Sequence, residues 1–374
     1  MLLVNFWYAH PVGHAIEALR YCLGYHLADA SLEVSVLLNG ATPLELAGCC
    51  PFVRHAYGVS YTDFLGRFGD ADEALREVPR EWDFVADDAR SRQPAQLAFD
   101  GVRIYYQAAH RHFSAHLHHG TAGAEPPPYR PHGALRLQLP DELRTRARER
   151  LAGAETRIAL LPAGSSEPSR YPSARSWELV VHALCDALPN SVLCLLGKLE
   201  RDTRTSTSMA AAELERIAAA APWAVSGVDL PLLEQLALAE ACDVFVAPHT
   251  GFGMAVLAVG TPWLALSGGP WHEWFFNDVP FYSVIPDTRR YPTYSRGAEP
   301  PALVDDDGTP RTPSMTRARI EEDLPELVEA ARMLVERRLS YDDALRRYFP
   351  TLLQAYGRDR SKIFSLDSVH ERYI

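Results

Sequence analysis

Residues 241–262 read ACDVFVAPHTGFGMAVLAVGTP and contain one strand-turn-helix unit. An apolar, β-branched run stops at Pro248, two glycines flank one aromatic residue, and small apolar residues continue from Met254 to Gly260. This pattern predicts a buried strand, a glycine turn and a short helix that starts at Met254. The first N–H groups of a helix lack partners within it and carry the positive end of its dipole. Because glycine lets a ligand approach the backbone, the turn is predicted to bind an anion such as phosphate.

Two side-chain donors, His249 and Thr250, stand at the mouth of this turn and favour an oxyanion ligand over a purely structural turn. The predicted contacts also include the segment Gly251-Phe252-Gly253. A structural turn remains the alternative, since any α/β domain contains such units. The glycine spacing approaches G-x-G-x-x-G without its last glycine, far from the N-terminus and without a ribose-binding acid, which disfavours a nicotinamide cofactor.

The length and charge of the chain limit the number of domains and the kinds of partner that can be expected. A chain of 374 residues suits two domains. The formal net charge of −11 argues against a nucleic-acid partner, which would require a basic face. Only Lys198 and Lys362 are lysines, and alanine is abundant, which indicates high-GC bacterial coding bias.

The cysteines and the N-terminus point to a cytoplasmic protein. The six cysteines show no C-x-x-C spacing and mostly lie in apolar runs, as expected for structural thiols. The first residues lack a basic segment followed by a long apolar core, and no later run reaches membrane-spanning length. We therefore expect no transmembrane segment. The oligomeric state stays open.

The first part of the chain predicts a Rossmann-like domain over residues 1–135, with a linker at about residues 120–140 that is rich in proline and glycine. A strand at residues 2–8, a loop, a helix and a second strand at residues 33–38 follow one another, which implies a parallel sheet. Further strands are expected at residues 52–53, 84–85 and 102–106.

The second part predicts a donor-binding domain over residues 141–335. It opens with a helix from Asp141 to Leu151, and its expected strands cover residues 157–161, 191–196, 223–225, 243–247 and 263–266. Residues 336–374 are expected to form a helix and a tail that pack across the domain junction. The fold class is thus α/β, with two doubly wound domains facing a cleft.

Ligands of such domains bind beyond the carboxyl ends of the strands, so the loops there hold the candidate residues. In the first domain the loop His10-Pro11-Val12-Gly13-His14 places two histidines at the start of a helix. Either histidine could act as a general base near neutral pH. Alternatively, His14 caps the helix and His10 packs beneath it.

Two loops of the second domain carry candidate phosphate ligands. The first contains Gly164, Ser165, Ser166 and Arg170, which offer backbone, hydroxyl and guanidinium donors. In the second, Lys198 could pair with phosphate and Glu200 could accept ribose hydroxyl groups. Ordinary surface loops are the alternative interpretation of both.

A loop after residue 266 contains Trp271 and His272, which are candidates for sugar or acceptor contacts. Burial of the tryptophan in the core is an equal alternative. The histidines between 110 and 119 lack the acids or cysteines of a zinc site, so a solvated helix and no metal are expected. The acidic turns at 70–72 and 305–307 lack a flanking strand. No G-x-S-x-G or phosphate-loop motif supports a hydrolase or an NTPase.

From Arg157 to Gly269 the chain resembles GT-B glycosyltransferases, and among them the heptosyltransferase-like group, glycosyltransferase family 9. That group has a D-[ST]-G-x-x-H turn before the helix under the donor diphosphate. Thr250-Gly251 match it, whereas His249 replaces the aspartate and Met254 replaces the histidine. Gly260-Thr261-Pro262 is similar to the group's G-x-P segment, and Arg170-Tyr171-Pro172 to its basic-aromatic-proline segment.

The resemblance implies a GT-B architecture and an inverting, metal-independent transfer of a sugar from a nucleotide diphosphate to a hydroxyl group, without a cofactor. The exchange at His249 leaves the sugar, the nucleotide base and the acceptor open, and a small molecule or natural product fits as well as a glycan. A nucleotide-sugar epimerase and a non-catalytic sugar-nucleotide-binding protein remain alternatives.

Overall fold

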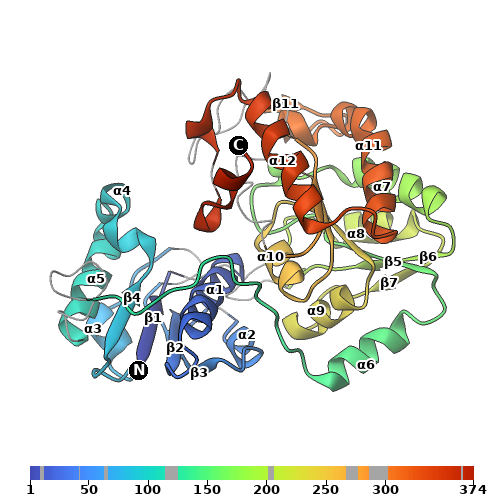
Figure 1. The fold of residues 1–374 in the computed structure, drawn as a ribbon. Coiled ribbons are helices and arrows are strands. Elements are labelled where there is room, and N and C mark those ends of the chain that lie inside the picture. Colours follow the sequence, from blue (N-terminus) through green and yellow to red (C-terminus); the bar gives the residue numbers. More distant parts are fainter. Residues whose placement is uncertain are drawn as a thin grey trace. The chain divides into compact units, whose positions relative to one another are not determined.

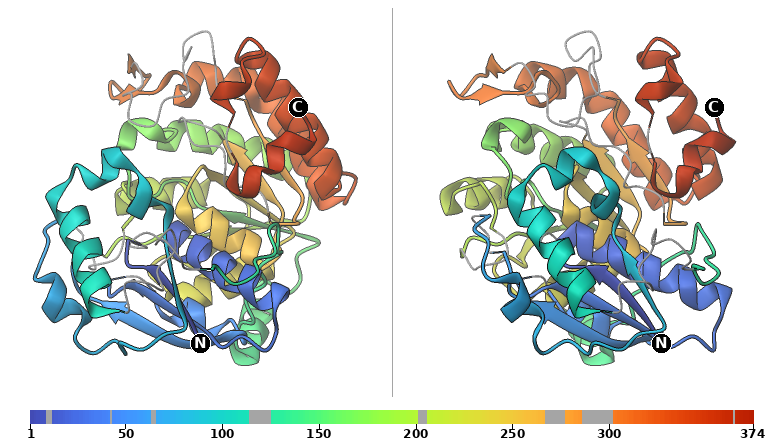
Figure 2. Two further views of the ribbon diagram at one scale, coloured as in Figure 1. Left: turned by 60° about the vertical axis from the view of Figure 1, so that its left-hand side comes forward. Right: turned by 90° about the vertical axis from the view of Figure 1, so that its left-hand side faces the viewer.

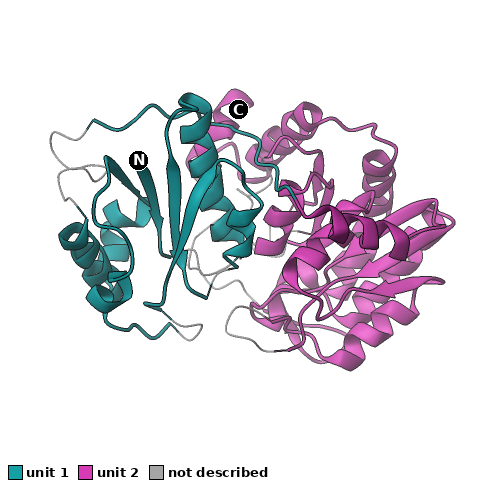
Figure 3. Ribbon diagram, turned by 90° about the horizontal axis from the view of Figure 1, so that it is seen from below, with its two compact units in different colours: residues 1–138, 202–204 teal, residues 139–201, 205–374 magenta. Residues whose placement is uncertain are grey.

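The computed structural model describes residues 1–8, 12–41, 43–62, 66–113, 125–200, 206–266, 277–285, 302–363 and 365–374. Contacts within the chain define two compact units, which Figure 3 colours separately. Unit 1 comprises residues 1–138 with 202–204, and unit 2 comprises 139–201 with 205–374. Residues 336–374 thus fall within unit 2. In the described part of the chain, no helix has both the length and the apolar character needed to cross a membrane.

Unit 1 is built on a parallel four-stranded sheet with the order β3-β2-β1-β4. Its strands are β1 (Leu2–Phe6), β2 (Val34–Asn39), β3 (Val53–Val59) and β4 (Phe84–Asp87). Its helices are α1 (Val12–Ala28), α2 (Glu45–Gly48), α3 (Ala71–Leu75), α4 (Pro94–Leu97) and α5 (Asp100–His112). The predicted strands at 2–8, 33–38 and 84–85 are confirmed, and the strand expected at 52–53 extends to Val59.

Helices cover both faces of this sheet, with α1 and α5 on opposite sides (Figure 1, Figure 2). On the α5 side, Leu3, Leu37 and Val85 pack against Tyr105 and further residues of α3 and α5. Burying these apolar side chains provides the main driving force for assembly of the unit.

The strand predicted at 102–106 is wrong, because this segment lies within α5. Val102, Tyr105, Tyr106 and Ala109 are buried, and their spacing of three and four residues is that of a helix face. Aromatic and β-branched residues within five positions favour a strand. Over the whole of α5, however, the buried residues recur every three to four positions, as in a helix.

Unit 2 is built on a parallel six-stranded sheet with the order β10-β9-β8-β5-β6-β7. Its strands are β5 (Thr156–Leu160), β6 (Ser191–Leu195), β7 (Ala224–Ser226), β8 (Val244–Pro248), β9 (Trp263–Leu266) and β10 (Phe281–Ser283). The five predicted strands are confirmed, and β10 is an additional strand. A small antiparallel hairpin pairs β11 (Leu303–Val304) with β12 (Pro310–Arg311).

The helices of unit 2 are α6 (Asp141–Arg150), α7 (Ala174–Ala187), α8 (Ala211–Ala219), α9 (Leu232–Glu240), α10 (Gly251–Ala258), α11 (Arg317–Val335) and α12 (Tyr341–Ala355). Six of them form two packed groups: α7 packs on α8 and α11, and α9 packs on α6 and α10. Right-handed crossovers between parallel strands place the two groups on opposite faces of the sheet. Both units are therefore doubly wound α/β domains.

Candidate functional site

The strand order of unit 2 reverses between β5 and β8, and doubly wound domains have their ligand crevice at such a reversal. The chain moves outward from β5 through β6 and β7 in one direction, and from β8 through β9 and β10 in the other. Ligands of doubly wound domains bind at this reversal, beyond the carboxyl ends of the two central strands. The loops that follow β5 and β8 contain Gly164, Ser165, Ser166, Arg170, His249 and Thr250.

Helix α10 begins at Gly251, three residues before the predicted start at Met254. Thr250 is its N-cap, and the Thr250 Oγ1 atom accepts the N–H of Gly253 at 3.3 Å. Among the described residues, no partner accepts the N–H groups of Gly251 and Phe252. Two amides, rather than the three of the predicted segment, are therefore available to an anion at this helix end.

Gly253 is required for packing. A Cβ atom at this position would collide with the ring of Trp263, which is fully buried. The ring of His249 stacks on the same tryptophan, with 6.0 Å between the ring centroids. The second glycine of the turn thus admits the Trp263 ring, and that ring supports His249.

The loop after β5 lies against the N-cap of α10. A Cβ atom at Gly164 would lie 3.4 Å from Thr250 Cγ2 and 3.0 Å from the hydroxyl of Tyr171. That hydroxyl accepts the N–H of Ser166 at 3.2 Å, and burial raises the pKa of Tyr171, which keeps the hydroxyl neutral. The structure thus brings together the two loops that the sequence identified separately.

Arg170 ends a short 3₁₀ turn, Pro168–Arg170, and its side chain is partly exposed. It makes no ion pair with any residue that the structure describes. A guanidinium group is suited to a diphosphate, because it can donate two parallel hydrogen bonds.

Lys198 and Glu200 differ from this pattern, because they pair with each other at 3.2 Å. The backbone of their loop is fixed from elsewhere. Asp229 accepts the N–H groups of Leu199 and Glu200 at 2.7 and 3.0 Å. The other two candidates of unit 2, Trp271 and His272, lie outside the described residues.

In unit 1 the strand order reverses at the corresponding position, between β1 and β4. His14 lies in the first turn of α1, and its Nε2 atom is 3.2 Å from the Nη2 atom of Arg90. A guanidinium can only donate, so Nε2 accepts this hydrogen bond and the imidazole is neutral with its proton on Nδ1. His10 lies outside the described residues.

Arg90 is held in place by a buried carboxylate. Asp88 Oδ1 accepts the N–H of Arg90 at 2.7 Å and faces its Nη1 atom at 3.5 Å. Burial raises the pKa of Asp88, and the charge of Arg90 opposes that rise. The guanidinium also lies over the ring of Tyr8, 4.6 Å from the centroid. Sequence reasoning missed Asp88 and Arg90, although an Asp-Asp-x-Arg segment directly after a strand was a usable signal.

The prediction of a solvated helix for the histidines of α5 is correct only in part, because the His110 side chain is 44% exposed whereas His112 is buried. His110 Nε2 lies 3.1 Å from Asp87 Oδ2, and the same carboxylate accepts the amide of Asn5 at 2.6 Å. His112 is buried and its Nε2 donates to the Val78 carbonyl at 2.7 Å. Histidines 116, 118 and 119 lie outside the described residues. In the part of the chain that is described, Asp305, Asp306 and Asp307 form the only cluster of three candidate metal ligands.

The strand orders of the two units define a fold class, a chain of two doubly wound α/β domains. Comparison with protein-family models and with curated protein sequences finds no match. Solved structures do match. E. coli ADP-heptose lipopolysaccharide heptosyltransferase II is 15% identical, with a TM-score of 0.51, 88% of this chain covered and 98% of that chain covered.

A glycosyltransferase of family 9 from Veillonella parvula is 13% identical, with a TM-score of 0.56 and coverage of 90% of this chain and 97% of that one. E. coli heptosyltransferase WaaC with ADP is also 13% identical, with a TM-score of 0.50 and coverage of 89% and 99%. This chain therefore has the GT-B fold, in its heptosyltransferase-like form. The expected fold class and resemblance are confirmed.

Proposed function

We propose that this protein is a glycosyltransferase that moves a sugar from a nucleotide diphosphate to a hydroxyl group of a small molecule or glycan, with inversion and without a metal. The fold that it shares with heptosyltransferases supports the reaction class. The observation that carries the proposal is in unit 2: Gly164 of the loop after β5 lies against Thr250, the N-cap of α10, and no described residue accepts the first two amides of that helix.

In this proposal unit 2 binds the donor. The diphosphate accepts hydrogen bonds from the amides of Gly251 and Phe252, from Ser165 and from Arg170, with His249 beside them. These groups stabilise the charge that develops on the diphosphate as the bond to the anomeric carbon breaks. They are fixed in advance by the fold, so little reorganisation accompanies the reaction.

Unit 1 supplies the base. The acceptor hydroxyl replaces Arg90 at Nε2 of His14, and its proton passes to that nitrogen as the acceptor oxygen bonds to the anomeric carbon. The nucleoside diphosphate leaves from the opposite face of the sugar. Before the acceptor binds, the hydrogen bond from Arg90, whose backbone N–H Asp88 accepts, keeps the imidazole in the tautomer whose Nε2 lone pair later accepts this proton.

The first test is thermal stabilisation by ADP, GDP, UDP, dTDP and CDP, with NAD as the control. A ligand at about 100 times its Kd stabilises the folded protein by about 2.7 kcal/mol, which shifts the melting midpoint measurably. We expect one diphosphate to stand out and thereby to name the donor base. If none of the five diphosphates shifts the melting midpoint, the donor site at Thr250-Gly251 is refuted.

The second test is turnover. The matching nucleotide sugar is incubated with candidate acceptors, and the products are analysed with and without acceptor. Transfer requires acceptor, whereas epimerisation yields a new nucleotide sugar without it. Binding that is never followed by turnover would instead indicate a sugar-nucleotide sensor.

A further inference from the structure

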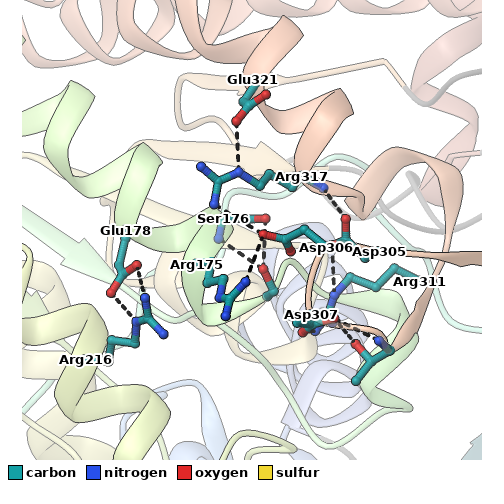
Figure 4. A network of polar contacts seen from close by, with 12 residues as sticks. Arg175, Ser176, Glu178, Arg216, Asp305, Asp306, Asp307, Arg311, Arg317 and Glu321 are labelled. Atoms are coloured by element: carbon teal, nitrogen blue, oxygen red, sulfur yellow. Dashed lines mark hydrogen bonds and ion pairs between the residues drawn. The ribbon is translucent and has the colours of Figure 1, made fainter.

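Arg311 is a buried arginine in unit 2, only 5% exposed, on strand β12. Figure 4 shows it within a network of acidic and basic side chains around the turn that contains Asp305, Asp306 and Asp307. Its Nε atom faces Asp305 Oδ2 at 3.2 Å, and its Nη2 atom faces Asp307 Oδ2 at 2.6 Å. A buried guanidinium needs such partners, because an unpaired charge in the interior is costly.

The remaining donor of Arg311 points to the loop after β5. Its Nη1 atom donates to the carbonyl oxygens of Pro168 at 3.1 Å and Tyr171 at 2.8 Å. The N–H of the next residue, Thr312, donates to the carbonyl of Ser169 at 2.7 Å. The dipeptide Arg311-Thr312 therefore binds the carbonyl groups of residues 168, 169 and 171.

These contacts surround Arg170 on both sides along the chain. Within the loop, the N–H of Arg170 donates to the carbonyl of Glu167 at 3.0 Å, and the Tyr171 hydroxyl accepts the N–H of Ser166. The backbone that carries Arg170 and Ser166 is consequently fixed from β12 on one side and from Tyr171 on the other.

The charge of Arg311 is already balanced by two aspartates, so this guanidinium is not available to an anionic ligand. Its contribution to binding must come through the loop that it holds. Fixing a binding loop before the ligand arrives removes the entropy cost of ordering that loop on binding.

We propose that Arg311 is a positioning residue for the donor diphosphate: from β12 it fixes residues 168–171 so that Arg170 faces the phosphate groups. This inference rests on the proposed function, in which unit 2 binds the donor. It differs from a purely structural role, in which loss of Arg311 would lower stability and leave the affinity of folded protein unchanged.

The test compares the variants R311Q, R170A, R311Q/R170A and R317Q in the full chain. R317Q is the matched control, because the Arg317 side chain belongs to the same network, with Asp306 and Glu321, but does not contact the loop. The probe is whichever of the five diphosphates stabilises the wild-type protein most, and its Kd is measured by titration calorimetry below the melting range of every variant.

We expect R311Q to weaken binding about tenfold, and R317Q to stay within about twofold of wild type. In the R170A background R311Q should add less than about a further twofold, because both substitutions remove the same contact with the diphosphate. Amide exchange at Ser166 and Arg170 should accelerate in R311Q and not in R317Q. If R311Q fails to fold, R311K takes its place, since lysine retains the charge but loses the fork.

Three results would each overturn the inference. The first is that folded R311Q or R311K binds the probe as tightly as wild type. The second is full additivity of R311Q and R170A, and the third is an equal loss of affinity in R317Q. A distinct outcome is that the wild-type protein binds none of the five diphosphates. That result would contradict the proposed donor site itself, and this inference with it.

Discussion

The two units share a topology and differ in the chemistry at its centre. In each sheet the first strand of the unit lies between its second and fourth, so the strand order reverses at the same place in both. At this place unit 1 has ionisable side chains in contact with one another, those of His14, Arg90 and Asp88. Unit 2 presents backbone amides, hydroxyl groups and one partly exposed guanidinium. Topology selects the location of a site, and the loop sequences select its chemistry.

The difference suits two tasks. Amides, hydroxyl groups and a guanidinium keep their protonation state near neutral pH and can bind an anion throughout that range. An imidazole can gain or lose a proton in the same range. The contrast predicts that substitutions in unit 1 change turnover and that substitutions in unit 2 change affinity or stability.

The largest expected effect is in unit 1. Replacing His14 by alanine should lower kcat by about 10²- to 10⁴-fold, the usual contribution of a general base, while leaving nucleotide affinity unchanged. Steady-state kinetics with the donor identified by the panel, together with nucleotide titration, would check both halves of this prediction.

His26, near the end of the same helix, stacks on Phe52 and gives the matched control H26Q, which should retain wild-type turnover. An H14A variant with full turnover, or one that loses nucleotide affinity and turnover together, would break the proposed division of labour between the units.

The next effect concerns stability in unit 2. The change Gly253→Ala places a Cβ atom against the rigid, buried ring of Trp263 and should destabilise the protein by about 1–3 kcal/mol, measured by urea unfolding. In unit 1, a Cβ atom added at Gly48 would meet no atom within 4 Å, so G48A should have little effect. Equal stabilities of G253A and wild type would show that the turn is not packed as described.

The smallest effect concerns the acidic turn that binds Arg311. Burial alone would raise the pKa of Asp307, but hydrogen bonds from Thr309 and Arg311 outweigh it and lower the pKa to about 2. A lowered pKa contributes stability above the ordinary aspartate value, and this contribution is lost as the pH falls from about 4 towards 2.

Wild type should therefore exceed D307N in unfolding free energy at about pH 5 by no more than about 1 kcal/mol, since solvent screens this partly exposed group. The gap should close as the pH approaches about 2. Urea unfolding at several pH values measures it, and a gap that persists at low pH would contradict the assignment.

Much of the fold could be predicted because the strands of parallel sheets are continuous apolar runs. The strands from β5 to β9 and the loops that follow β5 and β8 were recognisable for that reason. Helix α5 was not, because its aromatic residues favour a strand when only a short window is considered. The start of α10 was predicted three residues too late, because glycines in the first turn of a helix have the composition of a loop.

The contacts between distant segments could not be predicted. Nothing local indicates that Arg311 is buried or that it binds Pro168 and Tyr171, since arginine is usually exposed. The contact of Arg90 with His14 joins residues 76 positions apart. Such pairs depend on which strands become neighbours, and a single sequence does not specify that directly.

The contacts of Arg311 also determine when, during synthesis of the chain, the loop after β5 can reach its final structure. Its donors reach carbonyl groups 143 and 140 residues earlier in the chain. At a synthesis rate of about 5–20 residues per second, roughly 7–28 s separate the emergence of the loop from that of the arginine that holds it. The loop after β5 therefore remains a target for proteolysis during translation, and a nascent chain cannot assemble its phosphate-facing edge until the hairpin has been made.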